Sequence, residues 1–170
     1  LVVKEKDGKR IIYPAQFYYM ELNTARMLHD LNLEYEEANV VIEKKIHQIE
    51  KEAEMQLDEK QENAVMAAVR NGIMILTGGP GTGKTTTINA MIEYFHSENM
   101  EIMLAAPTGR AAKRMTEATG WEAQTIHRLL EVDFSEEGRS GFIHNEQNPL
   151  NADAVVIDEM SMVDVELFEA

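Results

Sequence analysis

The chain has 170 residues, and its 44% hydrophobic and 27% charged residues are typical of a globular domain rather than a disordered segment. It contains no cysteine, which excludes a disulfide framework and cysteine-ligated zinc and fits a reducing cytoplasm, and no apolar run approaches the length of a membrane span. The net charge of −14 excludes a surface that attracts DNA phosphates everywhere, so any nucleic-acid contact would need a local basic patch.

The first 56 residues predict a small, mainly helical subdomain. Residues 1–13 indicate short strands around a turn that contains Gly8, and Pro14 can open a helix that continues to residue 31. Residues 34–55 predict a second, charge-rich helix, whose apolar stripe consists of Val41, Ile42, Ile46 and Ile49. We therefore expect an amino-terminal helical unit, residues 1–56, ahead of the rest of the chain.

From residue 57 the pattern changes to helices that alternate with apolar strands. Asp58 and Gln61 form a capping-box pattern at the start of a helix, and Asn71-Gly72 ends that helix. Residues 73–77 are a continuous apolar run, as expected of a strand buried on both faces. The later segments predict a polar excursion at 133–151, strands at 102–106 and 154–157, and helices at 84–95, 108–118 and 124–130. This order predicts an α/β fold over residues 57–170, in which helices flank a parallel sheet.

The motif that carries the chemistry directly follows the first predicted strand. Its residues fit G-x-x-x-x-G-K-[ST] and are Gly78, Gly79, Pro80, Gly81, Thr82, Gly83, Lys84 and Thr85. Glycines let the backbone bend so that successive N–H groups point at phosphate oxygens, and the helix that begins here adds the positive end of its dipole. Lys84 would reach the β- and γ-phosphates of a nucleoside triphosphate, and Thr85 would place a hydroxyl group on Mg²⁺. A glycine turn before an ordinary helix is the competing interpretation, but the strand–loop–helix context favours nucleotide binding.

Two adjacent carboxylates, Asp158 and Glu159, follow the last predicted strand, at the carboxyl end where open α/β sheets bind ligands. Asp158 would hold Mg²⁺ directly or through water, and Glu159 is a candidate to orient or deprotonate the attacking water. Taken alone, an apolar run followed by two acids is usually a strand that enters a solvated loop. The phosphate-binding motif upstream favours the functional interpretation, with Lys84, Asp158 and Glu159 as the catalytic set.

A local basic patch follows the middle strand. Arg110, Lys113 and Arg114 stand at i, i+3 and i+4, so they share one face of the predicted helix, which Thr108 can cap. From residue 84 onward these are three of six basic residues, among sixteen acidic ones. The patch is a candidate phosphate or nucleic-acid contact, although a solvated surface helix would account for it equally well.

Three segments in this order resemble the superfamily-1 DNA helicases of the RecD/TraA type, a family that includes the exodeoxyribonuclease V alpha subunit. They correspond to motif I, motif Ia and motif II of that family, at 78–86, 106–112 and 156–162. Gln61 and the stretch 124–130 agree with two further signatures of the family. The close resemblance covers roughly residues 57–165 and implies a RecA-like P-loop NTPase fold.

The resemblance also implies ATP and Mg²⁺ as cofactors. Gln61 would read the adenine edge while it caps its helix, and Thr86 would join the nucleotide-binding residues of motif I. Thr108, Arg110, Thr125 and His127 match family positions at the single-stranded DNA or coupling surface. Lys113 and Arg114 join them as candidate DNA contacts because they share the helical face of Arg110. Family members move 5′ to 3′ on single-stranded DNA and unwind duplex ends in recombination and repair, alone or with other helicase–nuclease subunits, and no membrane is involved.

The chain stops shortly after motif II, so we expect it to lack motif III, the second RecA-like lobe and the arginine finger of the family motor. A strand carrying motif III would lie between the strands of motifs I and II, so the sheet would be incomplete. We therefore expect the 170 residues alone to show feeble ATPase activity and no unwinding. Two other classes stay open: a P-loop ATPase or kinase that acts on a small molecule, and a nucleotide-binding regulatory module with residues 1–56 as its docking unit.

Overall fold

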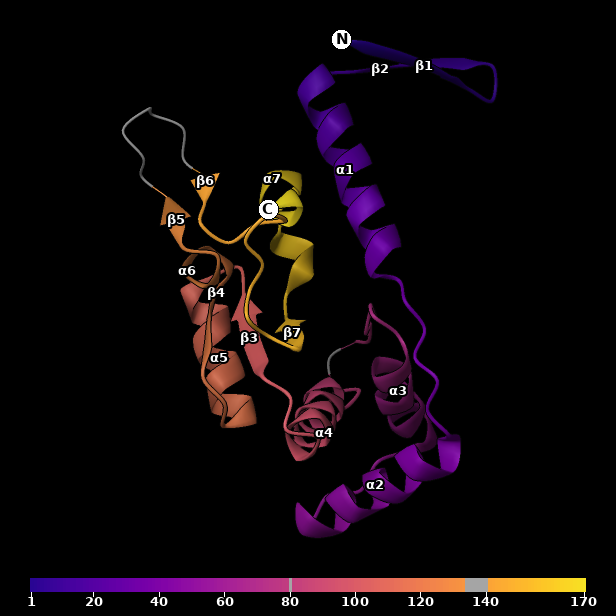
Figure 1. The fold of residues 1–170 in the computed structure, drawn as a ribbon, viewed down its shortest axis with the longest axis vertical. Helices are drawn as coiled ribbons and strands as arrows, with labels where there is room; N and C mark the ends of the chain where they lie inside the picture. The colour runs from indigo at the N-terminus through magenta and orange to yellow at the C-terminus, as the bar shows by residue number, and fades with distance from the viewer. Residues whose placement is uncertain (80, 134–140) are drawn as a thin grey trace.

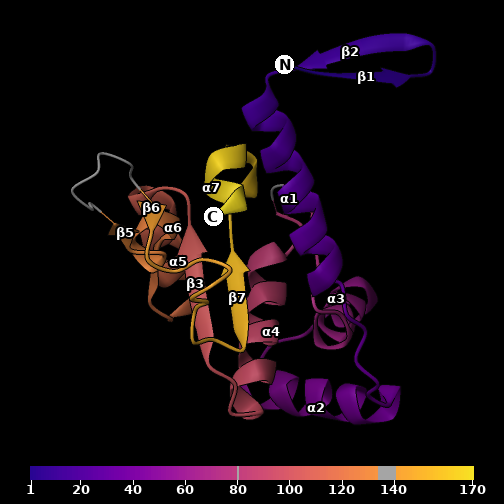
Figure 2. The same cartoon turned by 45° about the horizontal axis from the view of Figure 1, so that its top comes forward.

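The computed structural model describes residues 1–79, 81–133 and 141–170 (Figure 1). The chain begins with a hairpin of two antiparallel strands, β1 (Val2–Lys6) and β2 (Lys9–Tyr13). Asp7 and Gly8 form its turn with φ angles of 53° and 70°, the left-handed values that a two-residue type I′ turn requires. The predicted strands around a turn are thereby confirmed, and the hairpin projects away from the rest of the molecule (Figure 2).

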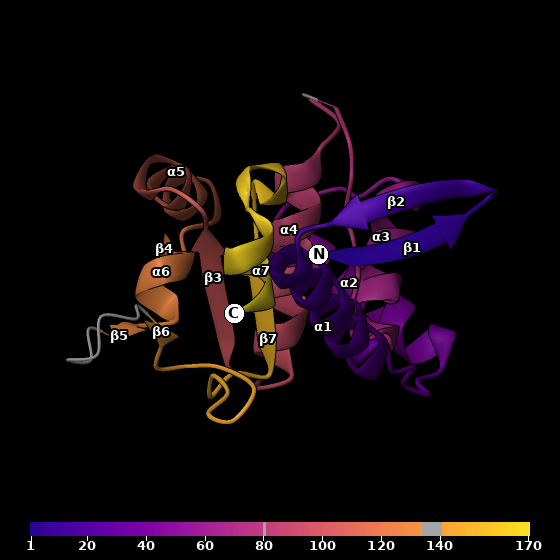
Figure 3. The same ribbon diagram turned by 90° about the horizontal axis from the view of Figure 1, so that it is seen from above.

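The hairpin leads into α1 (Ala15–Leu31), with Pro14 at the N-cap as the sequence predicts. This helix contacts the last helix of the chain, α7 (Val165–Glu169), and the two lie side by side when seen from above (Figure 3). None of the helices in the described part of the chain has the length and apolarity needed to cross a membrane.

The next three helices, α2 (Asn39–Glu52), α3 (Glu59–Arg70) and α4 (Lys84–Ser97), form a helical layer with one shared core. Its buried members are Ile42, Ile46, Ile49, Val65, Ala90, Met91 and Tyr94. Three of the four predicted stripe residues of α2 are in this core, but Val41 is 53% exposed, so its assignment to the stripe is wrong. α2 therefore packs directly on the helix that follows the phosphate-binding motif.

α2 also begins later than the sequence predicts, at residue 39 instead of 34. The preceding segment pairs with the end of α3: the Tyr35 N–H donates to the Arg70 carbonyl at 2.8 Å, and the Arg70 guanidinium donates to the Glu37 carbonyl at 2.8 Å. Glu34 forms an antiparallel bridge with Asn71. These contacts hold the segment extended, which excludes the helical backbone that its charge pattern favours.

A three-stranded parallel sheet forms the rest of the fold, in the order β4–β3–β7. Its strands are β3 (Ile102–Ala106), β4 (Ala123–Thr125) and β7 (Ala154–Ile157). α4 and α5 (Gly109–Thr119) cover the face that carries Leu104, whereas α6 (Ile126–Leu129) and α7 cover the face that carries Ala105. Successive strand residues point to opposite faces, so one short strand supplies both cores. The predicted α/β class with helices around a parallel sheet is confirmed.

The remaining elements lie between α6 and the end of the chain. The predicted polar excursion contains a short antiparallel pair, β5 (Val132–Asp133) and β6 (Gly141–Phe142), and its residues 134–140 lie outside the described part of the chain. The short helix expected at 124–130 is confined to α6, because Gln124 and Thr125 pair with β3 as β4 instead. A single 3₁₀ turn (Met160–Met162) joins β7 to α7.

One predicted strand is not formed. Residues 73–79 belong to no strand in the structure, and Ile75 is 83% exposed instead of buried on both faces. A strand is stabilised by hydrogen bonds to a neighbour, and β7 pairs only with β3 within the described residues. Within the described residues β7 therefore has no strand on its other edge, and the apolar run pairs with no strand.

Candidate nucleotide-binding site

The glycine-rich loop ends at the first residue of α4. Gly81 and Gly83 both have a φ of +75°, a left-handed conformation that L side chains rarely adopt, and Gly83 is the N-cap of α4. The Thr82 hydroxyl group donates to the Gly79 carbonyl at 2.8 Å, which closes the loop on itself. Pro80 lies outside the described residues. The loop therefore leads directly into the amino end of α4, the positive end of its dipole, where anions are favoured.

Lys84 points back over the loop from the first position of α4. Its ammonium group donates to the Gly78 carbonyl at 2.5 Å, and its side chain is exposed. An exposed cation held at the mouth of the loop can exchange this carbonyl for phosphate oxygens without crossing any packed group. Thr86, in the same first turn of α4, is half-buried behind it.

Gln61 connects the start of α3 to the loop. Its amide oxygen accepts from the Asp58 N–H at 2.8 Å, and the Asp58 carboxylate accepts from the Gln61 N–H at 2.9 Å, so the predicted capping box is confirmed. The amide nitrogen of Gln61 donates to the Gly83 carbonyl at 3.2 Å. The side chain therefore has both of its ends engaged, one in the helix cap and the other at the end of the phosphate loop.

Thr87 is a residue of this site that the sequence analysis missed. It is 3% exposed, and its hydroxyl group donates to the Gly83 carbonyl at 3.0 Å, beside the helical N–H bond to the same oxygen at 3.0 Å. With Gln61, three donors converge on the Gly83 carbonyl and fix the backbone where the loop becomes a helix. The signal was present, because a threonine four residues after a helix cap points back toward it.

The two carboxylates lie across a pocket from the first turn of α4. Asp158 directly follows β7, and its N–H donates to the Ala105 carbonyl at 3.0 Å, which continues the ladder between β7 and β3 by one residue. Thr85, Asp158 and Glu159 line one pocket of about 470 Å³. A hydroxyl group and two carboxylates are hard oxygen donors, the type of ligand that Mg²⁺ takes in phosphate-binding enzymes. The chemistry of this donor set therefore fits a magnesium ion.

The exposed Asp158–Glu159 step has a particular backbone. Glu159 has a φ of +57°, a conformation uncommon outside glycine, and its N–H donates to the Asp158 carboxylate at 2.8 Å. The left-handed residue ends the strand abruptly, and the N–H bond orients the Asp158 carboxylate. Both acids consequently stay at the carboxyl edge of the sheet, where ligands of open α/β sheets bind.

The structure divides the basic residues of α5 between two surroundings. Thr108 caps the helix as predicted, because its hydroxyl group accepts from the Ala111 N–H at 3.2 Å. Arg110 and Lys113 are exposed, and Lys113 lies 3.8 Å from Glu117 in an ion pair. Arg114 is also exposed, and it lines the pocket of Thr85, Asp158 and Glu159. The helical face that the sequence offered as a DNA contact thus extends to the wall of this pocket.

Thr125 and His127 lie away from this pocket. The Thr125 hydroxyl group caps α6 by accepting from the Arg128 N–H at 3.2 Å. His127 is exposed, and its ring meets Phe142 edge to face with 5.9 Å between centroids. It lines a second cavity, of about 790 Å³, between α1, the β5–β6 pair and α7.

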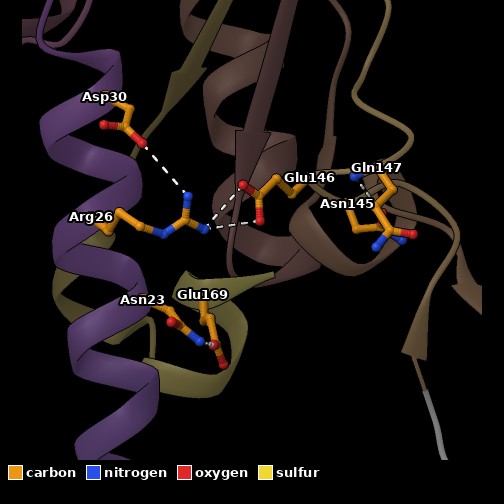
Figure 4. Close-up of polar contacts among 7 residues, drawn as sticks. All are labelled: Asn23, Arg26, Asp30, Asn145, Glu146, Gln147 and Glu169. Atoms are coloured by element: carbon orange, nitrogen blue, oxygen red, sulfur yellow. Dashed lines mark hydrogen bonds and ion pairs between the residues drawn. The ribbon is translucent and has the colours of Figure 1, made fainter.

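This second cavity is crossed by polar contacts that join the two ends of the chain (Figure 4). The Arg26 guanidinium of α1 donates to both carboxylate oxygens of Glu146 at 3.0 Å and lies 3.6 Å from Asp30. Nearby, the Asn23 amide donates to the Glu169 carboxylate at 3.0 Å. The wall is rich in carboxylates, which repel phosphate, so the cavity does not have the electrostatics of a nucleotide site.

Comparisons with known proteins agree with this geometry. Residues 61–170 match the family described as AAA domain. The chain is 41% identical over 115 residues to an ATP-dependent RecD2 DNA helicase of Deinococcus radiodurans, a match that covers 68% of this chain and 15% of that protein. It is 39% identical over 130 residues to the RecBCD enzyme subunit RecD of Mycolicibacterium smegmatis, and 33% identical over 169 residues to that of Haemophilus influenzae. These matches cover 62% and 84% of this chain, but only 23% and 25% of the two relatives.

Proposed function

The chain belongs to the AAA domain family, and on this basis we propose that it forms the ATP-binding part of a DNA helicase motor that hydrolyses ATP. The observation that carries the proposal is the pocket that Thr85 shares with Asp158 and Glu159, at the helix that directly follows the glycine-rich loop. One relative named above is an ATP-dependent RecD2 DNA helicase and the other two are RecBCD enzyme subunits RecD, which supports DNA as the polymer on which the motor acts.

Each residue of the pocket has a distinct role in this proposal. Lys84 binds the β- and γ-phosphates together with the N–H groups of the loop, and Gln61 binds the adenine edge from the start of α3. Thr85 and Asp158 hold Mg²⁺, which when bound neutralises charge on the phosphates. Glu159 orients the attacking water and accepts its proton, because it is the second carboxylate of the same pocket.

The proposed DNA contacts lie on α5 and α6, the helices that follow β3 and β4. Arg110 and Lys113 are exposed cations on α5, and Thr108 and Thr125 mark the amino ends of α5 and α6, where N–H groups can meet backbone phosphates. Arg114 and His127 complete the predicted set of DNA contacts. The whole protein would move 5′ to 3′ on single-stranded DNA and open duplex ends. It would act in recombination or repair in the cytoplasm, with or without other helicase–nuclease subunits.

The proposal also sets a limit for the 170 residues by themselves. An arginine finger from a second lobe is worth orders of magnitude in the hydrolysis rate of such motors. We propose that the chain alone binds ATP·Mg²⁺ but hydrolyses it feebly and does not separate strands. A small-molecule kinase or a purely regulatory nucleotide switch is not favoured, because one relative is named as an ATP-dependent DNA helicase and another as a RecBCD enzyme subunit.

The test is binding of a fluorescent ATP analogue with Mg²⁺ to the 170-residue chain and to Lys84→Ala. Loss of one charge-assisted contact to phosphate should weaken binding about 10- to 150-fold. Asp158→Asn should shift the Mg²⁺ dependence of binding to higher concentration. Lys44→Ala, which removes an exposed lysine of α2, is the matched control and should bind as the parent does. Unchanged ATP·Mg²⁺ affinity in Lys84→Ala would show that the loop does not hold the triphosphate.

A further inference from the structure

The charges of this acidic chain are distributed unevenly. Residues 1–19 contain four of its 16 basic residues and two of its 30 acidic residues. The other 151 residues contain 12 basic and 28 acidic ones. The amino-terminal hairpin and the first turn of α1 are therefore a basic region on a strongly acidic protein. Figures 1 and 2 show this hairpin extending beyond the other elements, so its charges reach solvent away from the acidic surface.

The strand register separates the hairpin charges onto one face. Residues directly opposite each other share a face, and so do residues two apart on one strand. Lys4 pairs with Ile11, and Lys6 pairs with Lys9. These three lysines consequently point to the same side, and each of them is exposed. On the other side Glu5 is opposite Arg10, so that face is neutral. The structure places three cations together on the first face, here called the lysine face.

The lysines of this face are not neutralised by carboxylates within the part of the chain that the structure describes. None of the ion pairs within the described residues involves Lys4, Lys6 or Lys9. Lys6 and Lys9 stand directly opposite each other, an arrangement that is destabilising for like charges. The neighbouring carboxylate, Asp7, belongs to the turn. An external anion that lies along such a row of like charges would relieve their repulsion, and the row would attract it.

Aromatic rings continue the lysine face onto α1. Tyr13, at the base of the same face, lies 5.6 Å from Tyr18, and Tyr18 lies 5.4 Å from Tyr19, measured between ring centroids. The Lys4 ammonium is 5.1 Å from the centroid of the Tyr18 ring, and the polar contact with Tyr18 raises the pKa of Lys4. Tyr19 is 57% exposed, so at least one ring of this row is open to a ligand.

We propose that the lysine face and the tyrosine row together bind single-stranded nucleic acid. Lysines that follow a phosphate backbone beside rings that stack on bases are the two components of sequence-independent single-strand binding. A duplex keeps its bases stacked inside, and an acidic protein surface has no planar bases, so neither would use the tyrosines. This surface lies far from the α5 patch (Figure 3), and it does not depend on the helicase proposal.

The experiment measures fluorescence anisotropy of a labelled oligo-dT of about 15 nucleotides. The protein is the 170-residue chain carrying Arg110→Gln and Lys113→Gln, so that the α5 patch does not hide the effect. Into this background we place Lys4→Gln, Lys6→Gln and Lys9→Gln together. Loss of three phosphate contacts should lower the slope of log affinity against log salt by about 2, since each contact contributes about 0.7 on a single strand.

Matched controls separate the site from a general charge effect. Changing Lys44, Lys51 and Lys60 to Gln removes the same charge from exposed positions on α2 and α3 and should leave the salt slope unchanged. Tyr19→Ala should weaken oligo-dT binding about 5- to 150-fold by loss of stacking, whereas Tyr19→Phe should bind as the parent does. Circular dichroism checks that each protein is folded.

Four results would overturn the proposal. The hairpin variant and the lysine control could bind oligo-dT with equal salt slopes, which would locate binding elsewhere. Tyr19→Ala could bind oligo-dT as tightly as Tyr19→Phe, which would show that no base stacks on this ring. A duplex could bind as tightly as the single strand, which would indicate a site for polyanions in general. Finally, a polyglutamate peptide could displace oligo-dT at equal charge concentration, which would favour an acidic protein partner.

Discussion

Gly83→Ala should destabilise the chain far more than Gly81→Ala, although both glycines have the same φ of +75°. A left-handed alanine costs about 1–2 kcal/mol at either position. At Gly81 a new Cβ would meet nothing within 4 Å, so that is the whole expected cost. At Gly83 the Cβ would lie 2.3 Å from the Gln61 amide nitrogen, and the Gln61 side chain must leave its place.

The displacement of Gln61 sets the extra cost. It breaks the 3.2 Å bond to the Gly83 carbonyl and the 2.8 Å bond to the Asp58 N–H, each worth about 0.5–1.5 kcal/mol. Gly83→Ala should therefore lower the free energy of unfolding by about 2–5 kcal/mol, roughly 1–3 kcal/mol more than Gly81→Ala. Adding Gln61→Ala to Gly83→Ala should cost little more, because the same two bonds are already lost.

Urea denaturation, followed by the fluorescence of the single tryptophan Trp121, measures the free energy of unfolding. The parent is compared with Gly81→Ala, Gly83→Ala, Gln61→Ala and the double variant. The energies of Gly83→Ala and Gln61→Ala should then be strongly non-additive, as expected of residues in contact. Equal destabilisation by the two glycine variants, or additive energies in the double variant, would refute the inferred contact between Gln61 and the end of the phosphate loop.

Four other substitutions test the packing, a cap and a buried hydroxyl group by the same unfolding measurement. Ile46→Ala should cost about 2–5 kcal/mol because Ile46 is 2% exposed in the helical core, whereas Val41→Ala, at a side chain 53% exposed, should change stability by less than about 0.5 kcal/mol. Asp58→Ala should cost about 1 kcal/mol by removing the α3 cap, and a cost near zero would contradict the capping box. Tyr94→Phe should keep or raise stability at neutral pH, because the buried Tyr94 hydroxyl has no hydrogen-bond partner within the described residues. Burial, and then the charge of Glu37, raise the pKa of Tyr94 in the folded chain. Above about pH 10 the unfolded chain therefore ionises first, and the parent should lose stability relative to Tyr94→Phe. Melting temperatures of the two proteins that stay parallel from about pH 7 to 11 would contradict this.

Local signals in the sequence predicted most of the helical boundaries. Asp58 and Gln61 fixed the start of α3 because a capping box is decided within four residues, and the Pro14 start of α1 is equally local. The failures depend on distant partners. Residues 34–38 are extended because they pair with the end of α3, and residues 73–77 form no strand although their composition favours one. Sheet pairing is a property of two segments, and the apolar pattern of one cannot report the other.

The candidate site shows the same division. The motif predicted the left-handed glycines and the position of Lys84, and the strand–acid pattern placed Asp158 at the edge of the sheet, beside Thr85. The sequence did not show that Arg114 would line that pocket, because the side of α5 that faces the sheet is decided by packing. The roles proposed for these residues, and the boundary at residue 56, stay predictions.

α4 is wedged between two apolar clusters, since it gives Met91 and Tyr94 to the helical core and Ile92 to the core of the sheet. Interiors packed at crystal-like density transmit displacement instead of absorbing it. A tilt imposed on the first turn of α4, where Lys84 and Thr85 lie, would therefore displace α2 through the helical core. The helical layer would in that way respond to any ligand that moves this turn.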